Sequence, residues 1–176
     1  WEAALTEHGA IDITAKVGPR RMADRADGQI RVLFVSSEIF PLAKTGGLAD
    51  VSASLPAALA RQGIEPLLFM PGYPKALDAA VNKRVLSKLS GQPAFAGART
   101  VAGQTPDTGL PLWLLDAPRL FERDGGPYQD LNGHDWPDNA QRFGLFCRAA
   151  AAMAAQWLPD IVHLNDWQTG LTALFL

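Results

Sequence analysis

The chain has 176 residues, of which 48% are hydrophobic, so it is long enough for one well-packed domain and too short for two of ordinary size. Lys and Arg number 16 against 18 Asp and Glu, which leaves no basic field to hold nucleic acid or an anionic membrane. No apolar run reaches the roughly 18 residues of a membrane span. The single cysteine, Cys147, excludes a disulfide framework, falls in an apolar helical pattern and favours a reducing compartment. We therefore expect a cytoplasmic protein with no nucleic-acid or membrane partner.

The first third of the chain predicts an extension followed by a strand and a helix. Residues 1–29 mix Ala, Gly, Pro, Arg and Asp without sustained apolar periodicity, which predicts an extension or linker that is partly disordered. The apolar run from Ile30 to Val35 predicts a buried parallel strand. From Leu48 to Gln62, apolar residues recur at helical spacing, and Gly63 stands where such a helix would end. The stretch from Lys44 to Val51 therefore follows the carboxyl end of a strand and opens a helix.

This stretch is a candidate anion-binding loop. Ligands of open α/β sheets bind where a helix N-terminus offers unpaired N–H groups and the positive end of its dipole. Gly46 and Gly47 would let the backbone approach an anion, and Lys44 would add a positive charge. Glu38 could orient Lys44 or a sugar hydroxyl, and Asp50 falls in the first helical turn.

A plainer interpretation of the same loop stays open. Many strand-to-helix loops carry two glycines only because the turn needs positive φ, and a neighbouring lysine is then simply solvated. The spacing fits neither the P-loop nor the dinucleotide-binding fingerprint. Glu38 would in that case be an ordinary loop carboxylate.

The middle of the chain is less regular. Glu65 to Met70 predicts a second buried strand, closed by a turn at Pro71 to Pro74. Three short segments then predict strands that are partly antiparallel: Val81 to Ser90, Ala94 to Val101 and Leu110 to Leu115. Asp116 to Asp138 has no helical pattern and predicts a long loop, of the length that is usually functional or mobile.

The last part returns to regular structure. Asn139 to Trp157 predicts a helix with Asp138 as its N-cap, and Ile161 to Leu164 predicts another buried strand. Asn165 to Leu171 then forms a second polar loop that opens a helix. The chain begins at Trp1 and stops inside an apolar run without a helix stop signal, so we expect a piece of a longer protein.

The residues of these loops closely resemble bacterial glycogen synthase and plant starch synthase. The resemblance begins with Val35 to Val51 and extends, in family order, from Ile30 to the end of the chain. Its further motifs are Leu55 to Leu59, Met70 to Tyr73, Asp116 to Pro118, Pro127 and Tyr128, Pro137 to Phe143, and His163 to Leu171.

The resemblance implies a fold and an activity. The fold is α/β: a Rossmann-like parallel sheet with flanking helices, here the incomplete amino-terminal half (30–176) of a two-domain GT-B glycosyltransferase. The implied enzyme is a hexosyltransferase that transfers glucose from ADP-glucose to the non-reducing end of an α-1,4-glucan with retention, using no metal and no cofactor. The second domain, which supplies most of the nucleotide pocket, lies outside this sequence, so the fragment alone is expected to be inactive.

The resemblance also assigns roles to residues. Lys44 matches the lysine that contacts the nucleotide sugar, and Gly46 and Gly47 match the backbone that approaches its diphosphate. Glu38 and Asp50 complete the expected substrate-binding set. Asp166 and Tyr128 match residues near the glucose and are the expected catalytic residues.

Plainer roles remain for these last residues. Asp166 could have no role beyond capping a helix, and Tyr128 none beyond packing its loop. His163 is better explained as a structural histidine than as a catalyst. Gln168 stands where many family members have histidine, which puts one hydrogen bond in question.

Two other functions remain open at the level of the sequence. The chain could be a glucan-binding or regulatory module without catalysis, or part of another sugar-nucleotide glycosyltransferase.

Overall fold

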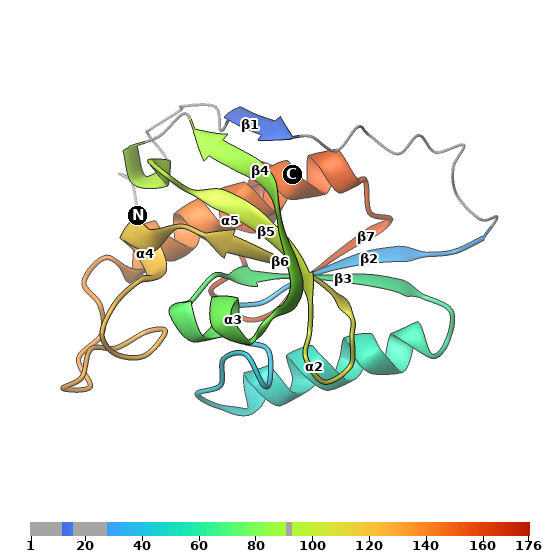
Figure 1. Ribbon diagram of the computed structural model, residues 1–176, viewed down its shortest axis with the longest axis horizontal. Helices are drawn as coiled ribbons and strands as arrows, with labels where there is room; N and C mark the ends of the chain where they lie inside the picture. The colour runs from blue at the N-terminus through green and yellow to red at the C-terminus, as the bar shows by residue number, and fades with distance from the viewer. Residues whose placement is uncertain (1–11, 16–27, 91–92) are drawn as a thin grey trace.

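The structure is a computed structural model that describes residues 12–15, 28–90 and 93–176 (Figure 1). Its strands are β1 (Asp12–Ala15), β2 (Arg31–Val35), β3 (Glu65–Pro71), β4 (Val81–Ser90), β5 (Arg99–Gln104), β6 (Pro111–Asp116) and β7 (Ile161–Leu164). Its helices are α2 (Gly47–Ala60), α3 (Pro74–Ala79), the 3-10 helix η2 (Pro93–Phe95), α4 (Pro118–Phe121), α5 (Asn139–Trp157) and α6 (Thr172–Phe175). Of the expected extension, 12–15 form strand β1, 28 and 29 precede β2, and the rest lies outside the described residues.

The seven strands form one mixed sheet in the order β1-β4-β5-β6-β3-β2-β7. Strands β6, β3, β2 and β7 are parallel neighbours, with Leu33 opposite Leu67 on one side and Val162 on the other. Strands β1, β4, β5 and β6 are antiparallel neighbours. The Rossmann-like α/β class is therefore confirmed for the parallel half, and the antiparallel strands occupy the segment where the sequence predicted them.

The core lies between the sheet and its helices. Every residue of β2 is buried, as a continuous apolar run in a parallel strand predicts. Figure 1 shows α2 on one side of the sheet and α5 on the other. Phe146 of α5 stacks on Phe69 of β3 with ring centroids 5.2 Å apart, and Met153 of the same helix is fully buried. The predicted burial of Cys147 is confirmed, and this thiol packs in the same helix.

Three short helices were not predicted, and each has a proline at its first or second position. Helix α3 occupies the predicted turn after Pro74, and α4 lies inside the predicted loop after Pro118. Pro93 begins η2, so the predicted strand from Ala94 starts only at Arg99. Proline fixes φ near the helical value and lacks only an N–H that has no acceptor at a helix start. In all three cases a proline outside the predicted helices therefore begins a short helix.

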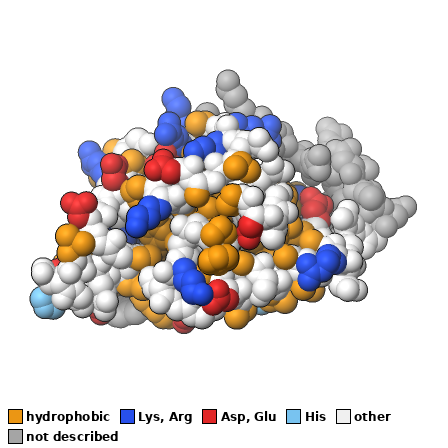
Figure 2. All heavy atoms as spheres, turned by 60° about the horizontal axis from the view of Figure 1, so that its bottom comes forward, with side chains coloured by type: hydrophobic (Ala, Val, Ile, Leu, Met, Phe, Trp, Pro, Cys, Tyr) orange, Lys and Arg blue, Asp and Glu red, His pale blue; other side chains and the backbone are white. Residues whose placement is uncertain are grey.

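No helix in the described part of the chain is long and apolar enough to cross a membrane. Figure 2 shows basic and acidic side chains interspersed with hydrophobic ones over one face of the molecule.

Candidate functional site

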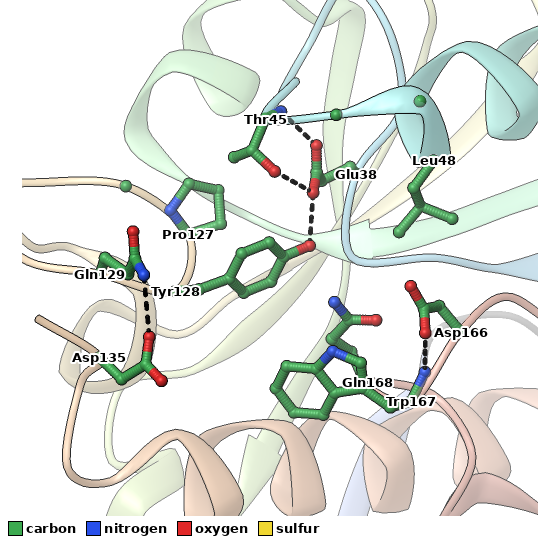
Figure 3. A pocket seen from close by; sticks show the side chains of 13 residues that line it. Glu38, Thr45, Leu48, Pro127, Tyr128, Gln129, Asp135, Asp166, Trp167 and Gln168 are labelled. Atoms are coloured by element: carbon green, nitrogen blue, oxygen red, sulfur yellow. Dashed lines mark hydrogen bonds between the residues drawn. The ribbon is translucent and has the colours of Figure 1, made fainter. Parts of the chain in front are cut away.

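A cavity of about 630 Å³ opens at the carboxyl ends of the parallel strands, a volume within the range of small-molecule sites (Figure 3). Four segments form its walls: the loop after β2, the start of α2, the long loop before α5, and the loop after β7. Its lining residues are Glu38, Thr45, Gly46, Gly47, Leu48, Gly126, Pro127, Tyr128, Gln129, Asp135, Asp166, Trp167 and Gln168. The structure thus brings together five of the seven predicted site residues, namely Glu38, Gly46, Gly47, Tyr128 and Asp166.

Glu38 connects two of these walls and is 2% exposed. Its Oε1 accepts hydrogen bonds from the Tyr128 hydroxyl and from Thr45 Oγ1, both at 2.6 Å, and its Oε2 accepts one from the backbone N–H of Thr45 (Figure 3). Of the alternatives left open for Glu38, orienting Lys44 is not what the structure shows, because the carboxylate is occupied by Thr45 and Tyr128 and Lys44 pairs with Asp50. Glu38 holds the loop at α2 to the long loop ninety positions away in the sequence.

The hydroxyl of Tyr128 can be assigned a donor and an acceptor role. A phenol has one proton, and Tyr128 donates it to Glu38, so Ser37 Oγ at 2.7 Å must donate its own proton to the Tyr128 oxygen. Burial, followed by the hydrogen bond to Glu38, raises the pKa of Tyr128 far above its ordinary value. Tyr128 is therefore a neutral phenol, and its ring also lies against Phe143 and Trp167.

The two adjacent glycines have no conformational reason to be glycine. Gly46 is extended, with φ of -153°, and Gly47 is the first residue of α2; neither belongs to the positive-φ glycines of the described chain. A Cβ at either position would meet no atom within 4 Å. The alternative that the turn needs positive φ is therefore wrong. Both glycines line the cavity. No side chain forms a capping hydrogen bond at the N-terminus of α2.

Lys44 and Asp50 do not line this cavity. Lys44 Nζ lies 2.8 Å from both carboxylate oxygens of Asp50, and both side chains are about half exposed. Lys44 also lies near the ring of Phe40, 5.6 Å from its centroid. An exposed ion pair of this kind contributes little to stability. Lys44 can therefore leave Asp50 and pair with another anion beside Gly46 and Gly47.

Asp166 has a left-handed backbone conformation, which Asp tolerates better than most other side chains. Its φ is +64°, and its Oδ1 accepts the backbone N–H of Trp167 at 2.7 Å. Asp166 does not cap a helix, because α6 begins only at Thr172 and has Leu171 at its N-cap position. Its carboxylate accepts the N–H of the adjacent residue and lines the cavity instead (Figure 3).

The neighbouring residue Asn165 joins this loop to the end of β2. Its side-chain Nδ2 and its backbone N–H both donate to the carbonyl of Val35, at 3.0 and 3.1 Å. The two polar loops predicted from the sequence therefore meet at one edge of the sheet.

The long loop is anchored by two arginines. Arg142, 1% exposed, donates to the carbonyls of Leu120 and Pro127 and to Asn139 Oδ1. Arg123 forms a two-pronged ion pair with Asp138, with Nη1 to Oδ1 at 2.7 Å. Asp138 holds the N-cap position of α5 as predicted, but its side chain caps nothing because Arg123 occupies it. This ion pair, led by the hydrogen bond from Arg123, lowers the pKa of Asp138.

Several lining residues were not among the predicted site residues. Thr45 carries no signal of its own beside two glycines, and Trp167 has no titratable group. In the sequence, Gln168 stands out only as a departure from the histidine of many family members. Gln129 and Asp135 bond to each other at 3.1 Å across the long loop. Within the described residues, no cluster of three His, Cys, Asp or Glu side chains could hold a metal ion.

A helix N-terminus that borders a cavity at the carboxyl ends of parallel strands defines a Rossmann-like domain with a ligand site at its sheet edge. The chain matches the family described as "Starch synthase catalytic domain" over residues 31–176. The chain belongs to this family.

Individual relatives agree with the family match. The chain is 51% identical over 154 residues to a glycogen synthase of Paramagnetospirillum magneticum, covering 84% of this chain and 31% of the relative. It is 50% identical over 147 residues to a glycogen synthase of Burkholderia thailandensis, covering 81% of this chain and 28% of the relative. The chain therefore spans less than a third of the length of these relatives.

A solved structure is also similar. The catalytic domain of starch synthase IV from Arabidopsis thaliana, bound to ADP and acarbose, matches with a TM-score of 0.67 and 29% sequence identity. The match covers 82% of this chain and 29% of that chain.

Proposed function

We propose that the chain is the amino-terminal part of a glycogen synthase of the GT-B type. The longer protein transfers glucose from ADP-glucose to the non-reducing end of an α-1,4-glucan with retention, and this part supplies one wall of the site. The open space beside Gly46 and Gly47, at an uncapped helix N-terminus, carries the proposal. Glycine lets a ligand approach the backbone closely, and the N–H groups of a helix N-terminus favour an anion.

The chemistry follows from the charge that develops in the reaction. When the bond between glucose and the diphosphate breaks, the departing ADP gains negative charge. Fixed N–H groups at the start of α2 and the ammonium of Lys44 stabilise that charge, and they do so most strongly in the transition state. The part described here accounts for half of this electrostatic site, and a second domain supplies the rest.

The contacts of the other four predicted residues indicate a separate role for each. Glu38 acts as a positioning residue, because its carboxylate oxygens bind Thr45, beside Gly46, and Tyr128 of the long loop and so hold these two segments together. Asp166 lines the cavity opposite the start of α2 and is the carboxylate proposed to lie near the glucose. Tyr128 binds as a neutral phenol and is not a general base, because its pKa is raised. Asp50 forms the ion pair with Lys44 that the sugar nucleotide would replace.

The names of the relatives and the ADP in the Arabidopsis structure support a synthase over a glucan-binding module without catalysis. The cytoplasmic location expected from the single cysteine stays a prediction.

Incorporation of labelled glucose from ADP-glucose into glycogen tests the proposal. We expect the longer protein to be active and the 176-residue chain to have negligible activity, since half of the site is absent from it. Lys44→Ala in the longer protein should lower kcat/KM by roughly 10²-fold or more. Substantial turnover by the short chain, or a longer protein that transfers no glucose, would contradict the proposal.

A further inference from the structure

The side-chain oxygen of Gln168 is buried and has no hydrogen-bond partner among the described residues. The residue is 3% exposed, and no described group donates a hydrogen bond to its buried Oε1. The residue nevertheless lines the cavity. Figure 3 shows its amide pointing into the space between the Tyr128 ring and the Asp166 carboxylate. Buried polar groups are almost always hydrogen-bonded, so an amide left unpaired beside a cavity requires an explanation.

The backbone around Gln168 is held in place. The carbonyl of Gln168 lies 3.2 Å from Cys147 Sγ on helix α5. Thr169 Oγ1 donates to the carbonyls of Asn165 and Asp166, at 3.0 and 3.1 Å. The loop is therefore fixed on both sides of the amide, and the amide is oriented toward the cavity before any ligand arrives.

The two walls of the cavity differ in polarity. The wall at Gly46 and Gly47 offers backbone N–H groups and the positive end of a helix dipole, which suits an anion. The opposite wall carries the carboxylate of Asp166 and the amide oxygen of Gln168, which repel an anion but accept hydrogen bonds from hydroxyl groups. The indole of Trp167, 56% exposed, adds a flat apolar surface on the same side.

We propose that Gln168 is a specificity-determining residue whose amide binds a hydroxyl group of a hexose in this cavity. An amide both accepts and donates, as a sugar hydroxyl does, so one side chain can make a paired contact with the sugar. The inference rests on the proposed function. The hexose is either the glucosyl unit of the donor or the terminal glucose of the glucan, and the experiment separates these two sources.

The test compares Gln168→Leu with Gln62→Leu in the longer protein. Gln62 is exposed just after the end of α2 and is not among the residues that line the cavity, so it is a matched control of the same residue type. The measurements are KM and kcat for ADP-glucose and for maltoheptaose, the Kd of ADP alone, and the urea midpoint of unfolding.

For Gln168→Leu we expect kcat/KM to fall about tenfold or more for one of the two sugar substrates, because a site that pairs with a hydroxyl loses that contact. A fall confined to ADP-glucose identifies the donor glucosyl unit, and a fall confined to maltoheptaose identifies the glucan end. The Kd of ADP alone should change by less than about twofold, and Gln62→Leu should have a much smaller effect on either substrate. The urea midpoint should stay the same or rise, since the substitution removes no hydrogen bond from the protein.

Three results would overturn the inference. Unchanged sugar kinetics in Gln168→Leu, with an active parent protein, would leave the proposed function standing and remove only the role of Gln168. A lower urea midpoint with an equal loss for both sugars and ADP would show a structural role. A parent protein that transfers no glucose from ADP-glucose would remove the proposed function and this inference together. If Gln168→Leu fails to fold, Gln168→Asn, which withdraws the amide by one methylene, tests the same contact.

Discussion

Gly47→Ala and Gly72→Ala should have opposite effects on stability. A Cβ at Gly47 meets nothing within 4 Å, whereas a Cβ at Gly72 lies 2.8 Å from the carbonyl oxygen of Leu115 and 3.0 Å from two further backbone atoms. Gly72 also donates its N–H to that carbonyl at 2.8 Å, so strands β3 and β6 lie close together there. Alanine at Gly47 should stabilise the fold by about 0.4 to 1 kcal/mol through the unfolded chain. Alanine at Gly72 should destabilise it by about 1 to 3 kcal/mol, since backbone must move.

Gly47→Ala should lower the enzyme activity of the longer protein although it stabilises the fold. In the longer protein, Gly47→Ala places a methyl group where the proposed diphosphate approaches the start of α2, so kcat/KM for ADP-glucose should fall about tenfold or more. Urea unfolding followed by far-ultraviolet circular dichroism measures the first effect, and glucose transfer measures the second. A Gly47→Ala protein that is less stable by more than about 1 kcal/mol, or one with full activity, would refute the reasoning.

Three further predictions concern the groups around the cavity. Tyr128→Phe removes one of the three hydrogen bonds to the buried Glu38 carboxylate and takes away the acceptor of the Ser37 hydroxyl, so urea unfolding should show a loss of about 1 to 3 kcal/mol, and an unchanged midpoint would contradict the network. The pKa of Asp138 is lowered by Arg123, so its contribution to stability is present above its ordinary pKa of 3.8 and is lost as the pH falls through its lower folded pKa. Asp138→Asn should therefore flatten the acid side of the stability curve, whereas Asp107→Asn, at an exposed position, should leave that slope as it is. Burial raises the pKa of the Cys147 thiol, so Ellman's reagent should modify it only after unfolding, and rapid labelling of the folded protein would disprove this.

The major elements could be predicted because their signals are local. The buried runs of β2 and β7, and the helical spacing in α2 and α5, are patterns within a few consecutive residues, and their observed bounds agree with the predicted ones to within one or two residues. The loops at the ends of these elements were therefore placed correctly at one edge of the sheet.

The contacts inside the site could not be predicted from such patterns. Glu38 and Tyr128 are ninety positions apart, and no spacing in the sequence indicates that the Tyr128 hydroxyl donates a hydrogen bond to Glu38. Lys44 pairs with Asp50 across a loop-to-helix junction, where helical spacing rules do not apply. The unpaired amide of Gln168 is a property of its burial, which only the folded chain reveals.

The binding position of the diphosphate tests the central claim most directly. A crystal structure of the longer protein with ADP-glucose bound should place phosphate oxygens within about 3.2 Å of the backbone nitrogens at Gly46, Gly47 or Leu48. It should also show Lys44 released from Asp50 and directed toward the same phosphates. A diphosphate bound elsewhere, with the start of α2 contacting only water, would contradict the account.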